Sequence, residues 1–198
     1  MTRQSAQLTY YGDGVIGLDE VGRGPLAGPL CVAAVMLPDG ALIEGLNDSK
    51  KVSPKRRLVL AEQIADLATA IGLAYVAAGD IDRYGIGACL RKCFRGALDQ
   101  ALAGYGGSCS QVLVDGRPLG IDSREEAVVK GDATIACIAA ASIYAKVHRD
   151  ALMVKYAEEY PEYGFEHNKG YGTAAHIAAI KAHGLTPIHR RSFCGHFI

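Results

Sequence analysis

The chain has 198 residues, of which 49% are hydrophobic, so it is long enough to bury a core, and no linker-like or low-complexity stretch divides it. Its 21 basic residues balance 21 acidic residues, so no overall basic excess marks a nucleic-acid-binding protein. No apolar run reaches membrane-spanning length and the N-terminus lacks a charged segment followed by an apolar core, so we expect a cytoplasmic protein, monomeric by default. Six cysteines without a C-x-x-C pair indicate buried free thiols rather than disulfides or a zinc site.

Apolar runs bounded by turn residues predict five strands, near residues 14–20, 29–37, 70–78, 110–115 and 125–130. Helices are expected from Ser53-Pro54 to about Thr69, from Asp80 to about Ala103, from Ala133 to Glu159 as one helix or two, and from Thr173 to about Ala182. The first two strands, joined by a Gly-Pro loop, should pair antiparallel, and strands separated by helices should pair in parallel. We therefore predict one α/β domain over residues 1–198, with a mixed five-stranded sheet flanked by helices to about residue 160 and a helical C-terminal extension over about 161–198.

The first apolar run leads into two adjacent acids, Asp19 and Glu20, and then into the glycine-rich segment 22–28. Neighbouring side chains on a regular strand point to opposite faces, so we expect the strand to end or bulge here and let the two acids converge. A surface turn with solvated acids is the alternative, which the apolar run and the glycine density disfavour. The glycine spacing is also similar to a dinucleotide-binding loop, but residues 29–37 predict a second strand where that loop requires a helix.

Asp115 and Asp132 each follow another strand-like run. Ligands in α/β sheets collect outside the carboxyl ends of strands, so we expect these acids to meet Asp19 and Glu20 in one crevice. Four crowded carboxylates repel one another unless cations bridge them, and oxygen ligands suit Mg²⁺ or Mn²⁺. The pattern therefore indicates phosphodiester hydrolysis assisted by two metal ions. Asp132 taken alone is equally explained as the cap of the helix that follows it.

Six motifs in order make the chain similar to ribonuclease HII from about Val15 to Phe193. They are Asp19-Glu20-Val-Gly-Arg-Gly-Pro-Leu-Ala-Gly-Pro29, Leu46-Asn-Asp-Ser-Lys-Lys51, Leu113-Val-Asp115-Gly, Lys130-Gly-Asp132 with Ala139-Ala-Ala-Ser-Ile-Tyr-Ala-Lys146-Val, Asn168-Lys-Gly-Tyr-Gly-Thr173 and His189-Arg-Arg-Ser-Phe193. The resemblance implies an RNase H-like fold and a nuclease that uses Mg²⁺ or Mn²⁺. It further implies cleavage of the RNA strand of RNA/DNA hybrids and incision 5′ of single ribonucleotides embedded in duplex DNA, leaving 3′-hydroxyl and 5′-phosphate ends.

The resemblance also implies roles for individual residues. The metal ligands and catalytic acids fall on Asp19, Glu20, Asp115 and Asp132. The residues that read the ribose 2′-hydroxyl fall on Gly22, Arg23 and Gly24, and the tyrosine that packs against the nucleotide at the RNA-to-DNA junction falls on Tyr171, for which anchoring its own loop is the alternative. Phosphate contacts are expected from Asn47, Lys50, Ser142 and Lys146.

Clusters of basic residues offset the balanced net charge; they are Lys50-Lys51, Lys55-Arg56-Arg57, Arg91-Lys92 and Arg190-Arg191, of which the second and third are also typical of a solvated helix face. The six histidines have no metal-ligand spacing with the acids, and we expect them at the surface or in supporting positions.

Two other functions compete with the ribonuclease: another nuclease or integrase-like phosphotransfer enzyme on this architecture, and a non-enzymatic nucleic-acid-binding module. The related ribonuclease HIII usually carries an extra N-terminal domain. Fewer than about fifteen residues precede the first predicted strand of this chain, so we expect no space for such a domain here.

Overall fold

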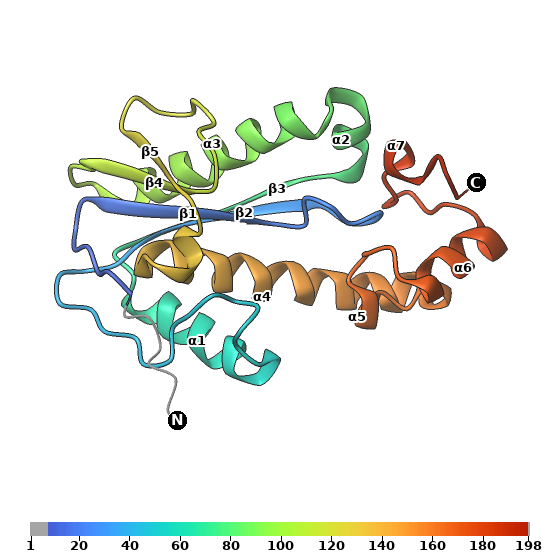
Figure 1. The fold of residues 1–198 in the computed structure, drawn as a ribbon, viewed down its shortest axis with the longest axis horizontal. Coiled ribbons are helices and arrows are strands. Elements are labelled where there is room, and N and C mark those ends of the chain that lie inside the picture. Colours follow the sequence, from blue (N-terminus) through green and yellow to red (C-terminus); the bar gives the residue numbers. More distant parts are fainter. Residues whose placement is uncertain (1–7, 198) are drawn as a thin grey trace.

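The computed structural model describes residues 8–197, in which a five-stranded sheet lies between two layers of helices (Figure 1). The strands are β1 (Val15–Val21), β2 (Leu30–Met36), β3 (Ala70–Val76), β4 (Gln111–Asp115) and β5 (Glu125–Val128). The longer helices are α1 (Pro54–Leu67), α2 (Ala78–Tyr84), α3 (Ile86–Tyr105), α4 (Ala136–Glu159) and α6 (Ala174–His183), and the short ones are α5 (Phe165–Asn168) and α7 (Arg191–Cys194). Helices α2 and α3 cover one face of the sheet, and α4 covers the other with α1 packed beneath it.

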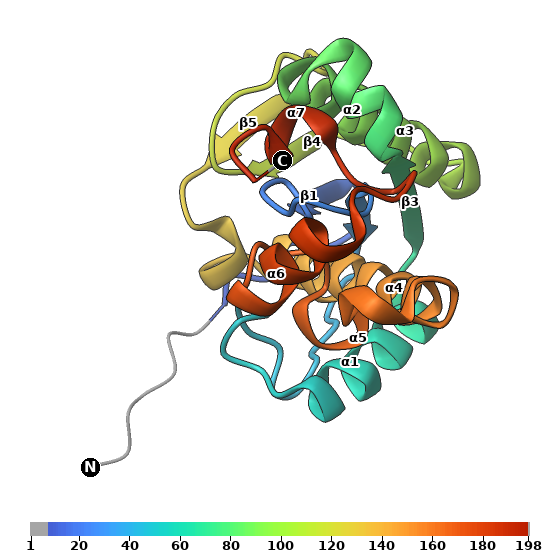
Figure 2. The ribbon, with the colours of Figure 1, turned by 90° about the vertical axis from the view of Figure 1, so that its right-hand side faces the viewer.

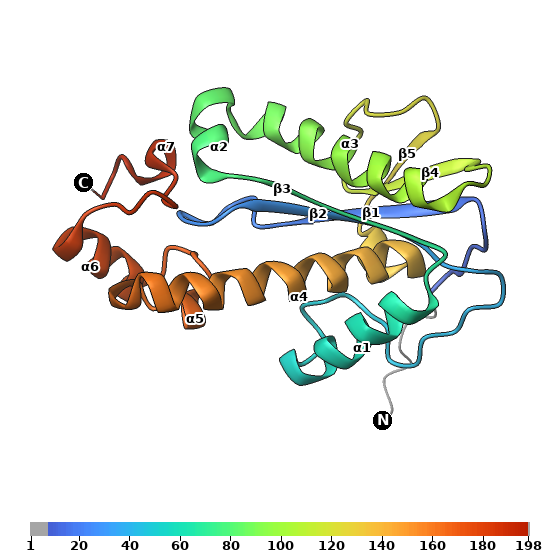
Figure 3. The same ribbon diagram turned by 180° about the vertical axis from the view of Figure 1, so that it is seen from behind.

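The strand order is β3-β2-β1-β4-β5, with β1 parallel to β4 and β4 parallel to β5, whereas β1 with β2 and β2 with β3 are antiparallel. The mixed sheet is as predicted, but the parallel pairing expected between strands separated by a helix is wrong for β2 and β3. Met36 at the end of β2 lies opposite Ala70 at the start of β3, and the Thr69 N–H donates to the Met36 carbonyl at 3.0 Å. The chain therefore returns to the end of the sheet that it left, and α1 is an excursion within a long hairpin connection (Figure 3).

The two faces of the central strands bury two separate apolar layers. Alternate residues of β1 and β2, such as Leu18 and Val32, pack against α3, and the residues between them pack against α4. The alanine-rich start of α4 lies close to β1: a Cβ atom built at Gly17 would overlap the backbone of Cys137. This close packing places α4 directly under the strand that carries Asp19.

Local capping signals locate two helices correctly. Ser53 accepts a hydrogen bond from the Arg56 N–H at the start of α1, and Thr173 accepts one from the His176 N–H at the start of α6. The single helix predicted from Asp80 to Ala103 is wrong, because Gly85 at φ +75° separates α2 from α3.

The segment before α4 also differs from the prediction. A short 3₁₀ helix, Gly131–Ala133, precedes α4, which then runs without interruption to Glu159. The N-cap position of α4 belongs to Ile135, with no side-chain cap hydrogen bond, so Asp132 does not cap this helix.

The chain beyond residue 160 forms a 3₁₀ helix, Pro161–Tyr163, and then α5, α6 and α7, which lie across one end of the sheet (Figure 2). This segment is hydrogen bonded to the β1–β2 loop: the Leu26 N–H donates to the Gly170 carbonyl at 2.8 Å, and the Arg190 N–H donates to the Leu26 carbonyl at 2.8 Å. All six cysteines are buried free thiols, as predicted. Across residues 8–197, none of the helices combines the length and the apolar character that a membrane crossing requires.

Candidate active site

A cleft of about 290 Å³ opens beside the carboxyl end of β4. It is lined by Asp19, Glu20, Val21, Gly22, Arg23, Gly24, Ser49, Lys50, Asp115, Asp132, Ser142, Lys146 and Tyr171. The last pair between β1 and β4 joins Leu18 with Val114, while β1 continues to Val21. Because β4 ends at Asp115, one residue past this pair, the edge of β1 beyond Asp19 has no strand beside it on this side, and the cleft opens there.

Asp19 and Glu20 lie on a regular strand. They stand opposite Ala33 and Val32 of β2 in an uninterrupted register, so the predicted strand end or bulge at this point is wrong. The two side chains point to opposite faces of β1, and both reach the cleft because β4 ends where they begin. The convergence of the acids thus comes from the short neighbouring strand.

Asp19 is the most deeply buried of the four predicted acids, with 7% of the residue exposed. One carboxylate oxygen accepts a hydrogen bond from the Glu20 N–H at 2.7 Å. Burial raises the pKa of Asp19 well above its usual range, a hydrogen bond with Ser142 lowers it, and repulsion from Asp115 and Glu20 raises it further. The structure thus places this carboxylate where its charge needs a nearby cation.

Burial and a neighbouring carboxylate also disfavour the charged forms of Glu20 and Asp132, and a nearby cation partly offsets this at each. Burial raises the pKa of Glu20, Arg23 lowers it and Asp115 raises it. Burial also raises the pKa of Asp132, as do Asp115 and Asp48, while Lys50 lowers it with its ammonium nitrogen 4.0 Å from the Asp132 carboxylate. Asp115 accepts a hydrogen bond from the Gly131 N–H at 2.7 Å, which ties the end of β4 to the turn that carries Asp132.

The donor set of this cleft fits a hard divalent cation. The predicted ligands are all carboxylates, as Mg²⁺ and Mn²⁺ prefer, and neighbouring carboxylates raise the pKa of three of them. Within the described part of the chain, no three His, Cys, Asp or Glu side chains are already grouped closely enough to hold one ion. Among the described residues, the cations whose ion pairs reach these acids are the exposed Arg23, which pairs with Glu20, and Lys50, which pairs with Asp132.

The Gly22-Arg23-Gly24 segment forms one wall of the cleft. Gly22 has φ +84°, and a side chain there would meet the Pro29 carbonyl and the Arg149 guanidinium. Gly24 differs, because its φ is not in the left-handed region and no heavy atom lies within 4 Å of a Cβ built on it. The backbone at Gly24 is therefore open to a ligand, and Arg23 lies beside it with its guanidinium 3.7 Å from the Glu20 carboxylate.

Two buried arginines, which the sequence analysis did not identify as site residues, hold this wall in place. Arg190 donates to the carbonyls of Gly22, Arg23 and Gly28, and Arg149 donates to those of Ala27, Pro29 and Lys169. Both side chains are completely buried. Since Lys169 belongs to the loop that carries Tyr171, Arg149 joins the two walls of the cleft, and its guanidinium lies 6.0 Å from the centre of the Tyr171 ring.

A pair of buried histidines supports the Tyr171 loop from the other side. The Thr186 N–H donates to Nδ1 of His189, which leaves the proton of a neutral His189 on Nε2. That Nε2–H then donates to Nε2 of His176 at 3.0 Å, and Nδ1–H of His176 donates to the Tyr171 carbonyl at 2.9 Å. Burial lowers the pKa of both histidines, and that of His189 falls to about 4. Both rings are neutral near pH 7, and these two histidines occupy buried supporting positions.

The predicted phosphate-binding residues divide into two groups. Lys50, Ser142 and Lys146 line the cleft, and Lys146 is held by Asp150 at 2.8 Å. Asn47 does not line it; its side-chain oxygen instead accepts a hydrogen bond from the Asp48 N–H. Ser49, absent from the sequence prediction, lines the cleft with its hydroxyl 3.1 Å from that of Ser142. Its position within the Leu46–Lys51 motif was the available signal.

The comparisons with known proteins agree with one another. Residues 16–196 match the family model described as Ribonuclease HII. The chain is 45% identical to "Ribonuclease HII" of Geobacillus sp. (strain WCH70) over 98% of this chain and 69% of that protein, and 50% identical to "Ribonuclease HII" of Marinomonas sp. (strain MWYL1) over 93% and 92%. Its fold is similar to the crystal structure of the ribonuclease H2 from Pyrococcus horikoshii OT3, with a TM-score of 0.76, 26% identity and coverage of 92% of this chain and 96% of that one. The chain therefore belongs to the ribonuclease HII family of endoribonucleases, which hydrolyse phosphodiester bonds.

Proposed function

We propose that this protein cleaves the RNA strand of RNA/DNA hybrids and incises 5′ of single ribonucleotides embedded in duplex DNA, leaving 3′-hydroxyl and 5′-phosphate ends. The observation that carries the proposal is that one cleft joins four carboxylates to an open glycine backbone and an exposed tyrosine. The carboxylates suit phosphodiester hydrolysis, and the glycine backbone and the tyrosine suit recognition of the sugar next to the bond.

Asp19, Glu20, Asp115 and Asp132 are the proposed ligands of Mg²⁺ or Mn²⁺. When bound, such ions neutralise charge on the scissile phosphate and lower the pKa of the attacking water. Asp19 is the proposed central ligand because it is the most buried of the four and its hydrogen bond from the Glu20 N–H fixes its orientation. Asp115 is oriented in the same way by the Gly131 N–H.

Ribose recognition is proposed for the segment from Gly22 to Gly24. The open side of Gly24 allows a sugar to approach the backbone, whereas the carbonyls of Gly22 and Arg23 are already occupied by Arg190. Tyr171 is 41% exposed and lies at the rim of the same cleft, so its ring is available to pack against the nucleotide on the DNA side of the junction. Lys50, Ser142 and Lys146 are the proposed phosphate contacts.

The hydrogen bonds between the β1–β2 loop and residues 170–190 also support a single domain over residues 1–198. Leu26 and Ala27 donate to the Gly170 carbonyl, and Gly28 donates to the Ile188 carbonyl. The two recognition walls are therefore built from both parts of the chain. We propose that the helical C-terminal segment does not act separately from the α/β core.

The direct test is incubation with a labelled DNA duplex that contains one ribonucleotide, with Mg²⁺, with Mn²⁺ or with EDTA, and mapping of the product ends. An all-DNA duplex is the substrate control, and Asp115→Asn is the control for a contaminating nuclease. We expect incision only at the ribonucleotide and only with metal, while Ca²⁺ and Zn²⁺ should fail to support it. Equal activity in EDTA, or cutting of the all-DNA duplex, would contradict the proposal.

The role of Tyr171 is tested on two substrates. Tyr171→Ala should weaken incision at a lone ribonucleotide more than cleavage within a continuous RNA strand, by the roughly 1–3 kcal/mol of a stacking contact. Tyr171→Phe retains the ring and should behave as the native protein on both. Equal losses on the two substrates for Tyr171→Ala would mean that Tyr171 only anchors its loop.

A further inference from the structure

A second cleft, of about 660 Å³, continues from the candidate active site along helix α3. It shares Glu20, Arg23 and Asp115 with the first cleft. The rest of its lining comes from α3, which contributes Arg91, and from the loop between β4 and β5, which contributes Arg117. A strand bound across the four acids can therefore continue into this second cleft past Glu20.

Two arginines of this cleft have no partner in the described protein. Arg91 and Arg117 are both exposed, and within residues 8–197 neither makes an ion pair or a side-chain hydrogen bond. The neighbouring arginines have structural partners instead: Arg95 contacts Asp99, and Arg124 contacts Asp122. Arg91 and Arg117 thus retain all their donors for a ligand.

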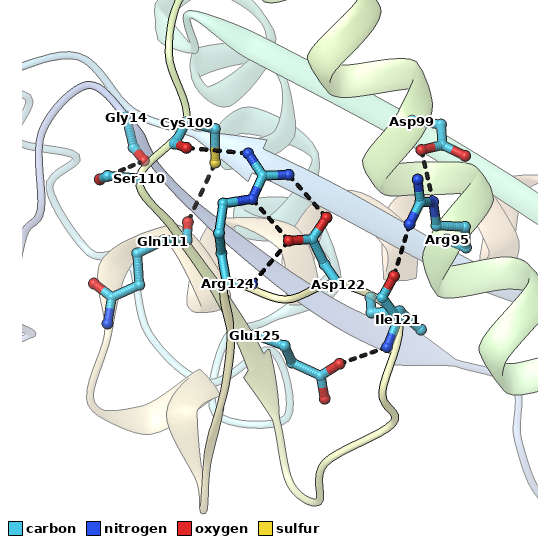
Figure 4. Close-up of polar contacts among 10 residues, drawn as sticks. All are labelled: Gly14, Arg95, Asp99, Cys109, Ser110, Gln111, Ile121, Asp122, Arg124 and Glu125. Carbon is cyan, nitrogen blue, oxygen red and sulfur yellow. Dashed lines mark hydrogen bonds and ion pairs between the residues drawn. The ribbon is translucent and has the colours of Figure 1, made fainter.

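The loop that carries Arg117 is fixed in position. Figure 4 shows Arg95 of α3 donating to the Ile121 carbonyl, at 2.8 Å, and Glu125 accepting from the Ile121 N–H, at 2.7 Å. Arg124 joins Asp122 to the Cys109 carbonyl on the other side of the loop. The loop is therefore held against α3, and the two elements contribute Arg117 and Arg91 to the lining of the same cleft.

The charges identify the ligand class. The part of the cleft shared with the active site carries the carboxylates of Glu20 and Asp115, which repel a polyanion, whereas the part formed by α3 and the β4–β5 loop carries the two uncommitted guanidinium groups. Guanidinium groups bind phosphate oxygens in a bidentate manner. The chain as a whole has zero formal charge, so attraction for nucleic acid has to come from such local cation pairs.

We propose that Arg91 and Arg117 bind backbone phosphates of the strand that is cut, on the α3 side of the scissile bond. This inference rests on the ribonuclease activity proposed above. It assigns part of the Arg91-Lys92 cluster to substrate binding: Arg91 faces the cleft, whereas Lys92 pairs with Asp80 at 3.6 Å and does not line it.

The experiment tests three variants: Arg91→Ala, Arg117→Ala and the double variant. The control is Lys92→Ala, which removes one positive charge from α3 at a position outside the cleft. The substrate is a fluorescent duplex with one ribonucleotide. The Kd for this duplex is measured by fluorescence anisotropy in EDTA, and KM and kcat are measured with Mg²⁺. Both sets of measurements cover 50 to 200 mM KCl. We expect the double variant to raise Kd and KM by roughly 10- to 100-fold, to leave kcat within about twofold, and to lower the slope of log Kd against log salt by about 2.

Shortened duplexes add a second readout. Removing base pairs on one side of the ribonucleotide should weaken binding by the wild-type protein but not by the double variant, because the lost phosphates are those that the arginines hold. The proposal would be overturned if the double variant changed Kd and KM no more than Lys92→Ala does. It would also be overturned if shortening the duplex weakened binding by the wild-type protein and by the double variant equally. A fall in kcat with unchanged Kd would also overturn it, since the arginines would then act on the acids. If the wild-type protein binds but does not cleave, the anisotropy data still decide the phosphate site and the proposed activity fails separately.

Discussion

The two glycines on either side of Arg23 separate ribose recognition from folding. Gly22 has a left-handed backbone and is packed against Arg149 and Pro29, whereas Gly24 has open space around it and a φ that any residue adopts. Gly22→Ala should therefore destabilise the fold, and Gly24→Ala should leave it intact while it blocks the approach of the sugar.

The structure gives the size of each effect. Alanine in the left-handed region costs about 1–2 kcal/mol. A Cβ on Gly22 would also lie 2.7 Å from the Pro29 carbonyl oxygen and would overlap Nε of Arg149, which donates to that carbonyl; loss of this buried hydrogen bond costs about 1–3 kcal/mol. We expect Gly22→Ala to lower the free energy of unfolding by about 2–5 kcal/mol, and Gly24→Ala to change it by less than about 0.5 kcal/mol.

The assay is a urea unfolding curve for each variant together with kcat/KM on the duplex that contains one ribonucleotide. Gly24→Ala should lower kcat/KM by about 100-fold, which corresponds to about 2.7 kcal/mol of lost transition-state stabilisation. The reasoning is refuted if Gly24→Ala cleaves as well as the native protein, because the sugar then does not approach this backbone. A Gly24→Ala variant as unstable as Gly22→Ala would refute the structural half.

Three further predictions concern the acids, the buried arginine and the histidine pair. Asp19→Asn should lower cleavage about a thousandfold yet raise the urea midpoint in EDTA, because burial and neighbouring acids raise the pKa of Asp19 and make its charge unfavourable. Asp132→Asn should be equally inactive, because Asp132 does not cap α4 and its carboxylate is free to act as a metal ligand. Normal cleavage by either variant would disprove the site. Arg190→Met should lower the free energy of unfolding by at least about 3 kcal/mol, because the buried carbonyls of Gly22 and Gly28 and the partly buried carbonyl of Arg23 lose their donor. Arg190→Lys should recover part of this loss, and an unchanged urea midpoint would refute the prediction. His189 is neutral in the fold, with a pKa of about 4 against 6.5, so the unfolded chain binds more protons and stability should fall by about 3 kcal/mol as pH drops from 6.5 to 4. The fall should be smaller for His189→Gln in urea unfolding at pH 7, 6 and 5, and identical slopes for the two proteins would argue against it.

Interactions between residues close in the chain were readable from the sequence. Ser53 and Thr173 cap their helices through N–H groups three residues away, so these helix starts were predicted correctly. The motifs around Asp19 and Asp115 led to the ribonuclease HII family, which the family model supports over residues 16–196. The mixed sheet also followed, since the apolar runs that form strands are local features.

Whatever depends on distant partners was decided by the tertiary structure. The antiparallel pairing of β2 with β3 depends on where α1 packs, and the meeting of Asp19 with Glu20 depends on where β4 stops, so neither could be read from the residues around them. Arg149 and Arg190 look like ordinary surface cations in the sequence, yet all their carbonyl partners except that of Lys169 lie more than a hundred residues away. A buried guanidinium is stable only where several carbonyls converge, and that convergence does not exist until the chain has folded.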